Sequence, residues 1–246
     1  MNDTSSAPLL LLLPGLLCDH AVWRDQQAAL GDMRSLVIDY GAADSIEAMA
    51  RLALARADAP RFSVAGHSMG GRVALEIARL APERVERIAL MDTGMDPIAV
   101  GPAGEREVQG RMALLETARR EGMRAMGRAW ARGMVHADRL DTPLFDEILA
   151  MIERKTPDIF AAQLNALIRR PDARGVLAGL HGPSTLFLCG REDAWSPLAR
   201  HEDMHARVPG STLAVIDHSG HMSTMEQPAA VTQALRHWLA RPAAAR

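Results

Sequence analysis

The pentapeptide Gly66-His67-Ser68-Met69-Gly70 carries the clearest chemical signal in this 246-residue sequence. It follows a strand-like run, Arg61 to Ala65, and opens a helix-like run from Gly71 to Ala81. A serine on so sharp a turn adopts a strained backbone, and small residues two positions either side let the turn close. Glycine suits both positions because it has no Cβ. The pattern therefore predicts that Ser68 is a nucleophile.

A serine nucleophile needs a histidine to accept its proton and a carboxylate to hold that histidine in the right tautomer. Asp193 and His221 fit these roles. Asp193 follows the apolar run Thr185 to Cys189, and His221 follows the run Ser211 to Asp217. Each is expected on a loop at the carboxyl end of a parallel strand, where such sheets place their sites. The chain order Ser, Asp, His matches a known template for this kind of hydrolysis.

Three other residues compete for these roles or lie beside them. Asp92 follows the strand-like run Val85 to Met91, which is an alternative position for the acid. His218 is an alternative to His221, but it lacks a preceding glycine and lies nearer the strand. His67 precedes the nucleophile directly and is interpreted as a structural side chain, packed or hydrogen-bonded next to the site.

Hydrolysis through a serine also needs donors for the oxyanion that forms on the substrate carbonyl. One donor is expected to be the backbone N–H of Met69, directly after the nucleophile. The other should come from the loop after the first strand, which reads Leu13-Pro14-Gly15-Leu16-Leu17-Cys18-Asp19. We assign this second donor to the N–H of Leu16.

From about Leu9 to Leu239 the sequence resembles the α/β-hydrolase superfamily, and specifically its small single-domain esterases with a helical cap. The resemblance implies an α/β fold: a mostly parallel sheet with helices on both faces and an inserted helical cap. One departure is visible in the oxyanion loop, where the family commonly has His-Gly and this chain has Pro14-Gly15. Proline has no N–H and fixes its own φ, so a more rigid loop is expected.

The pattern of apolar runs predicts how the chain is divided. Strand-like and helix-like segments alternate up to Pro97 and again after about Leu180, as in a sheet covered on both faces. Between them the pattern is helical only, with breaks at Gly-Pro, Thr-Pro and Arg-Pro pairs. Residues 1–96 and 181–246 are therefore expected to form the α/β-hydrolase core, and residues 97–180 the inserted cap. Further strands are expected at Leu9 to Leu12 and Ser35 to Asp39.

A competing motif is His201-Glu202-Asp203-Met204-His205, which matches the His-Glu-x-x-His signature of zinc proteases. On a helix its two histidines would share one face and could bind zinc, with the glutamate as general base. The segment lies between two loops that already complete a serine triad, and no convincing third ligand follows it. We therefore expect no metal and no cofactor.

Composition limits the partners and the compartment. The chain is 48% hydrophobic with a formal net charge of −2, so it can bury a large core and has no overall basic footprint for nucleic acid. Its two cysteines, Cys18 and Cys189, are expected to be buried thiols. The N-terminal leucine run lacks the basic residues and cleavage site of a signal peptide, and no apolar run is long enough to span a bilayer. A cytoplasmic protein without a membrane partner is expected.

The expected cap carries a candidate substrate pocket. Met123, Met126, Trp130 and Met134 form a Met/Trp stripe at helical spacing, which would suit the roof of an adaptable apolar pocket but is equally typical of a cap core. The expected pocket residues are Leu17, Met123, Met126, Trp130, Met134 and Trp195.

A row of cap arginines follows an i, i+4 spacing on another face of what we expect to be the same helix. Such a row is usually a solvated face. Alternatively, it docks an acidic acyl-carrier protein or recognises an anionic acyl group. The row consists of Arg120, Arg124, Arg128 and Arg132.

Taken together, these residues predict a serine hydrolase that cleaves a small-molecule carboxylic ester through an acyl-enzyme. Within the same fold, a thioesterase or a carbon–carbon bond hydrolase would use the same triad on a different electrophile, and fold alone does not choose among them. The alternative that is not primarily an enzyme is a ligand receptor whose triad hydrolyses its ligand slowly. A metalloprotease is disfavoured for the reasons given above.

Overall fold

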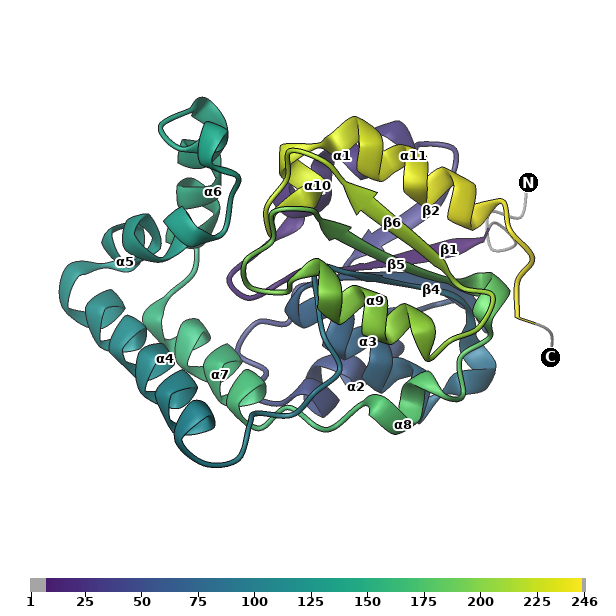
Figure 1. Ribbon diagram of the computed structural model, residues 1–246, viewed down its shortest axis with the longest axis horizontal. Coiled ribbons are helices and arrows are strands. Elements are labelled where there is room, and N and C mark those ends of the chain that lie inside the picture. Colours follow the sequence, from purple (N-terminus) through teal and green to yellow (C-terminus); the bar gives the residue numbers. More distant parts are fainter. Residues whose placement is uncertain (1–7, 245–246) are drawn as a thin grey trace.

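The computed structural model describes residues 8–244 and contains one parallel sheet with helices on both faces (Figure 1). The first seven and last two residues of the expected core span lie outside the described residues. Six strands lie in the order β2-β1-β3-β4-β5-β6, and every neighbouring pair is parallel. The predicted fold class is confirmed. The strands are β1 (Leu9–Leu13), β2 (Arg34–Val37), β3 (Phe62–His67), β4 (Val85–Met91), β5 (Thr185–Gly190) and β6 (Thr212–Ile216).

Helices connect successive strands and cover the sheet. In Figure 1, α1 and α11 lie over one face, while α2, α3 and α9 lie over the other. In α2 the apolar positions that recur at helical spacing are all buried, so this amphipathic pattern predicted the helix correctly. The core helices are α1 (Arg24–Ala29), α2 (Ile46–Arg56), α3 (Met69–Leu80), α8 (Arg174–Leu177), α9 (Leu198–Ala206), α10 (Ser223–Glu226) and α11 (Pro228–Leu239).

The turn between β3 and α3 is tighter than the sequence suggested. We expected the strand to end at Ala65 and the helix to begin at Gly71, but β3 continues to His67 and α3 begins at Met69. Ser68 is thus the only residue between strand and helix. This tightness is what holds its side chain at the carboxyl edge of the sheet.

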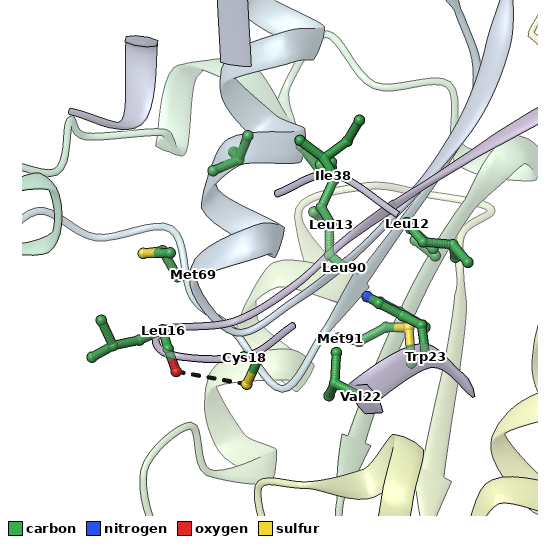
Figure 2. Close-up of a cluster of buried hydrophobic side chains, with 14 of the residues drawn as sticks. Leu12, Leu13, Leu16, Cys18, Val22, Trp23, Ile38, Met69, Leu90 and Met91 are labelled. Carbon is green, nitrogen blue, oxygen red and sulfur yellow. Dashed lines mark hydrogen bonds between the residues drawn. The ribbon is translucent and has the colours of Figure 1, made fainter. Parts of the chain in front are cut away.

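The central strands are buried on both faces, which explains their continuous apolar runs. All five leucines of β1 are buried. Figure 2 shows the cluster at the carboxyl end of this strand, where Leu12 and Leu13 lie near Trp23 and Leu90. Cys18 belongs to the same cluster, and its Sγ lies 3.6 Å from the carbonyl oxygen of Leu16. The core therefore reaches directly to the loop that we expect to supply an oxyanion donor.

Four helices between β4 and α8 form a helical insertion that lies to one side of the core (Figure 1). We use this name for residues 102–168. Three of these helices begin at the Pro residues of the predicted breaks, with proline in the first turn where its missing N–H is tolerated. The helices are α4 (Pro102–Glu121), α5 (Met123–Trp130), α6 (Pro143–Glu153) and α7 (Pro157–Ile168). The expected limits of the cap, 97 and 180, stay a prediction; α8 lies beside α3 of the core.

One expectation for the insertion was wrong. The arginine row and the Met/Trp stripe do not lie on a single helix, because Gly122 separates α4 from α5 with φ 92° and ψ 161°. In addition, Arg124 is engaged within the insertion, donating to Glu153 Oε2 at 3.0 Å and to Asp146 Oδ1 at 3.1 Å on α6. Docking of an acidic carrier protein stays a prediction.

Within residues 8–244, no helix combines the length and the apolar character that a membrane span requires.

Candidate active site

Ser68 occupies the strained position that the sequence predicted. Its φ is 55° and its ψ is −116°, a conformation that non-glycine residues adopt only when surrounding structure imposes it. The flanking glycines are required sterically. A Cβ at Gly66 would lie 2.2 Å from the carbonyl oxygen of Gly70, and a Cβ at Gly70 would lie 2.0 Å from that of Leu13. The close approach of β1, β3 and α3 therefore fixes where Oγ of Ser68 points.

The imidazole of His221 lies between Ser68 and Asp193. Its Nε2 is 2.8 Å from Ser68 Oγ, and its Nδ1 is 2.8 Å from Asp193 Oδ2. The other carboxylate oxygen of Asp193 accepts from the backbone N–H groups of Trp195 at 2.8 Å and Ser196 at 2.9 Å. Because Nδ1–H donates to the carboxylate, Nε2 is left to accept a proton from the serine.

The charges of this pair are set by their surroundings. Burial alone would raise the pKa of Asp193, but attraction to His221 and the hydrogen bonds from the His221 ring and two backbone amides lower it to about 2. Burial would lower the pKa of His221, but the charge and hydrogen bond of Asp193 outweigh burial and raise that pKa. Asp193 is therefore ionised at neutral pH and favours the protonated form of His221.

The loop that carries His221 is held from several directions. His221 N–H donates to the carbonyl of Met134 at 2.7 Å, and its own carbonyl accepts from His67 Nε2 at 2.7 Å. Glu226, which is 3% exposed, accepts at Oε1 from the N–H groups of Gly220 and Met222, both at 3.0 Å. Its Oε2 accepts from the N–H of His136 at 2.7 Å. The buried carboxylate of Glu226 thus links the residues on both sides of His221 to His136, in the segment that follows α5.

His67 has the structural position expected for it. Burial, together with the nearby His221, lowers the pKa of His67 to about 3, so its ring is neutral. Its Nε2–H donates to the carbonyl of His221, so the ring helps to hold the loop that carries His221 in place.

The competing acid and base positions have other partners. Asp92 is fully buried, and its carboxylate accepts from the N–H of Gly190 at 2.9 Å and from the hydroxyl of Ser223. Burial, followed by repulsion from Asp193, raises the pKa of Asp92 well above its ordinary value. His218 is exposed and packs edge-on against His136, with 5.8 Å between ring centroids. Neither residue hydrogen-bonds to the His221 ring within the described chain.

The His-Glu-x-x-His segment lies on α9 and is used in packing. His201 is fully buried; its Nε2 accepts from the N–H of Thr93 at 3.1 Å, and its Nδ1 lies 3.4 Å from the carbonyl of Pro197. His205 Nδ1 lies 2.7 Å from Ser211 Oγ. Both nitrogens of His201 therefore have protein partners. Over residues 8–244, no three His, Cys, Asp or Glu side chains group so that they could hold a metal ion.

The expected oxyanion donors flank Ser68 in the fold. Figure 2 shows Leu16 after the end of β1 and Met69 at the start of α3. In the described chain the N–H of Leu16 donates to no other group, and the N–H of Met69, at the first position of the helix, has no intrahelical acceptor. The next amide is occupied: Leu17 N–H donates to Gln163 Oε1 of α7 at 2.9 Å. A Cβ at Gly15 would lie 2.9 Å from His67 Nδ1, so this loop requires glycine there.

A cavity of about 490 Å³ opens beside Ser68 and His221, a size typical of small-molecule sites. Of the expected pocket residues, Trp130, Met134 and Trp195 line it, and the two tryptophan rings lie 5.0 Å apart between centroids. The expectation was wrong for Leu17, Met123 and Met126. Their side chains are buried in the packed core and do not form the cavity wall.

Sequence reasoning missed two kinds of residue at this site. Glu226 and Gln163 act on the loops through hydrogen bonds to backbone groups far away in sequence, and no local motif marks them. The cavity also has a cationic side, lined by Arg72, Arg106, Arg111, Arg170 and Arg200. These arginines come from separate elements, so no spacing in the sequence connects them.

The model of the alpha/beta hydrolase family matches residues 10–234, and the chain belongs to this family. A putative carbamate hydrolase RutD from Pseudomonas syringae pv. syringae is 29% identical over 253 residues, covering 96% of this chain and 95% of the relative. A thermophilic esterase from Thermogutta terrifontis, solved with malate bound, superposes with a TM-score of 0.83 and 30% identity over 94% of this chain and 89% of its own. A hydrolase from Pseudomonas aeruginosa PA01 gives a TM-score of 0.83 at 25% identity, over 95% and 90% of the two chains. Hydrolase activity is thus supported by relatives that cover nearly the whole chain.

Proposed function

We propose that this chain is a serine hydrolase that cleaves small carboxylic esters through an acyl-enzyme. The observation that carries the proposal is the continuous hydrogen-bonded chain Ser68 Oγ, His221 ring, Asp193 carboxylate at the wall of a cavity. Such a chain can activate a hydroxyl that is otherwise a weak nucleophile.

In the first half of the reaction, Ser68 Oγ attacks the ester carbonyl carbon while its proton passes to His221 Nε2. The negative charge that develops on the carbonyl oxygen is stabilised by the N–H groups of Leu16 and Met69. As the tetrahedral intermediate collapses, the carbon–oxygen bond to the alcohol breaks, and His221 gives its proton to the departing oxygen. The acyl group remains on Ser68.

In the second half, His221 Nε2 takes a proton from water, and the resulting hydroxide attacks the acyl carbon. The same two amides stabilise the second intermediate. The bond to Ser68 Oγ then breaks, the proton on His221 returns to the serine, and the carboxylic acid leaves. Asp193 keeps its negative charge throughout and stabilises the imidazolium that forms twice per turnover.

Labelling with a fluorophosphonate probe tests the nucleophile. Wild type should be labelled once and should hydrolyse short p-nitrophenyl esters with many turnovers, while Ser68→Ala should lose both properties. Ser63→Ala, at a buried serine on the strand β3 that precedes Ser68, is the matched control and should keep both. If Ser68→Ala retains wild-type turnover, the proposed mechanism is wrong, and a single slow turnover in wild type would favour the receptor alternative.

A carbamate is the second candidate substrate class, favoured by the near full-length similarity to the putative carbamate hydrolase RutD. It would use the same Ser68 attack with an ammonia or amine leaving group in place of an alcohol. Comparing kcat/KM for a methyl ester and the matching carbamate separates the two classes. A preference for the carbamate would change the substrate assignment and leave the role of Ser68 unchanged.

A further inference from the structure

One side of the cavity holds an excess of positive charge. Five arginines line it, contributed by α3, α4, the segment after α7, and α9. Among the described residues, the acidic side chains on the wall are Glu107 and Asp92. Asp92 is directed to Gly190 and Ser223, so Glu107 is left as the carboxylate that faces the arginines.

Glu107 is already shared by two of these arginines. Arg170 donates to its two oxygens at 2.7 and 3.1 Å, and Arg111 Nη2 donates to Oε1 at 2.9 Å. This arrangement satisfies one carboxylate with two guanidinium groups. On the described cavity wall, no further acidic side chain is then left to pair with Arg72, Arg106 and Arg200.

Among the described residues, Arg72 and Arg200 donate only to backbone acceptors. Arg72 Nη1 donates to the carbonyl of Asp96 at 2.8 Å, and Arg200 Nη1 to that of Trp195 at 3.2 Å. Within residues 8–244, neither guanidinium has a carboxylate within 4.0 Å, whereas Arg111, Arg120, Arg124 and Arg154 of the insertion each have an ion-pair partner. Each guanidinium therefore keeps N–H donors that can reach a ligand.

These like charges are also close to one another. Arg170 Nε donates at 3.1 Å to the same Asp96 carbonyl as Arg72, so the two donor nitrogens lie within about 6 Å of each other. Burial first, and then repulsion from Arg170 and Arg200, lowers the pKa of Arg72. An arginine nevertheless stays protonated at neutral pH, so the repulsion persists until an anion enters.

The cationic side begins about one helical turn from the nucleophile. Arg72 follows Ser68 by four residues at the start of α3, so the two positions share a face. Arg200 packs over Gly94, where an added Cβ would lie 2.6 Å from its Cδ. Gly94 directly follows Thr93, whose hydroxyl donates to the Ser68 carbonyl at 2.7 Å.

We propose that the cavity selects esters that carry a carboxylate a few bonds from the scissile carbonyl, and that Arg72 and Arg200 bind that carboxylate. The planar guanidinium fork matches the two oxygens of a carboxylate, and the apolar wall of Trp130 and Trp195 would cover the connecting carbons. This inference rests on the proposed function, since it names the substrate class of the same site.

Matched pairs of esters test the charge preference. Monomethyl glutarate and methyl pentanoate have the same acyl length and differ by a terminal carboxylate; 3-acetoxypropanoate and propyl acetate differ in the same way on the alcohol side. We expect kcat/KM for the anionic member of at least one pair to exceed that of its neutral partner by about tenfold or more. Equal values within both pairs, or preference for the neutral esters, would overturn the proposal.

Arginine variants test which groups are responsible. Arg72→Gln and Arg200→Gln should each reduce the ratio of anionic to neutral kcat/KM by about tenfold, and Arg200→Lys should retain part of it. Gly94→Ala, which displaces Arg200 without removing its charge, should reduce the ratio as well. Arg128→Gln on the exposed face of α5 is the control and should leave the ratio unchanged. An unchanged ratio in the folded Arg72 and Arg200 variants would refute their role.

Binding without catalysis separates this inference from the proposed function. Ser68→Ala protein should bind glutarate more tightly than pentanoate by about tenfold in calorimetry, and Arg200→Gln in the same background should remove the difference. This readout does not depend on Ser68 being the nucleophile. If glutarate binds no better than pentanoate, or if inorganic phosphate binds better than glutarate, carboxylate selection is wrong even if Ser68 proves catalytic.

Discussion

Asp92 and Asp193 are buried carboxyl groups at the ends of neighbouring strands, and their surroundings shift their pKa values in opposite directions. Burial and the nearby Asp193 raise the pKa of Asp92, whereas His221 and two backbone amides outweigh burial and lower that of Asp193 to about 2. Opposite shifts in a close pair separate their chemical roles. Asp193 is ionised beside the imidazole, and Asp92 links β4, β5 and α10 through hydrogen bonds.

Replacing each carboxyl group by its amide should therefore have unequal effects. Asp193→Asn should lower kcat by about a thousandfold or more, because the amide cannot stabilise the imidazolium and favours the wrong tautomer. Asp92→Asn should lower kcat by less than about tenfold, because an amide can accept from Gly190 N–H and donate to Ser223. Steady-state kinetics on one ester checks both. The reverse order of effects would make Asp92 the catalytic acid.

The pH profile gives a second test at this scale. Protonated His221 cannot accept the serine proton, so kcat/KM should fall as the pH drops through the pKa of His221. Because Asp193 raises that pKa, the midpoint should lie above the ordinary histidine value of 6.5. In Asp193→Asn burial loses the charge and hydrogen bond that oppose it most strongly, so the midpoint of the residual activity should move to lower pH. An unmoved midpoint would show that another group controls the acid limb.

Sequence could predict Ser68, Asp193 and His221 because each lies on the turn or loop that follows a strand, and the carboxyl ends of parallel strands meet at one edge. It could not identify Glu226. The three amides that Glu226 accepts from come from two loops, and only the folded chain brings these loops together.

At the scale of elements, the insertion depends on a backbone conformation that only glycine adopts readily. Gly122 separates α4 from α5 with φ 92° and ψ 161°. This break directs α5 back toward the core, where Trp130 reaches the cavity wall. Helical spacing across residues 120–134 hid the break, because a single glycine inside an amphipathic pattern is compatible with a continuous helix.

Two glycine substitutions should have opposite effects on stability. Gly122→Ala should decrease the free energy of unfolding by about 1–3 kcal/mol, because alanine is strained in this region. Gly110→Ala, inside α4 and with open space around the new Cβ, should increase it by about 0.5–1 kcal/mol. Urea unfolding followed by circular dichroism measures both. Similar stabilities for the two variants would contradict the assigned conformation of Gly122.

The loop carrying His221 should depend on Glu226 in activity as well as stability. In Glu226→Gln one of the two acceptor oxygens becomes an amide donor facing backbone N–H groups, so a loss of about 1–3 kcal/mol is expected. The histidine should lose its alignment, and kcat should fall with it.

Glu192→Gln serves as the control for that change. Glu192 is exposed and accepts from one amide, that of Ser219, at 3.0 Å. Glu192→Gln should lower the free energy of unfolding and kcat only slightly. Normal kcat in folded Glu226→Gln would show that the other contacts of the loop suffice.

At the scale of the whole molecule, apolar packing holds the core and continues into the insertion, and polar contacts add to the join between them. Gln163 on α7 accepts from Leu17 N–H at 2.9 Å, and Arg154 Nε donates to Asp19 Oδ2 at 2.6 Å. The fold class was predictable because strand and helix patterns alternate over most of the chain. The cationic side of the cavity was not, since its arginines come from four distant segments and meet only after the insertion packs on the core.

The sheet should show a clear gradient of stability from centre to edge. Leu11→Ala, on the fully buried strand β1, should reduce the free energy of unfolding by about 2–5 kcal/mol because it leaves a cavity between two helical layers. Leu36→Ala, half-buried on the edge strand β2, should lower it by less than about 2 kcal/mol. Denaturant titration compares them. Equal losses would mean that β2 is packed as tightly as β1.

The direction of the strands has a practical consequence for immobilisation. The amino end of β1 and the carboxyl end of α11 lie on the side of the core away from the helical insertion (Figure 1). All six strands run toward the other side, where Ser68 and the mouth of the cavity lie. A bead or electrode coupled through a linker beyond either of these ends would therefore hold the protein with its cavity facing the bulk liquid. Attachment through the insertion would turn the same opening toward the support.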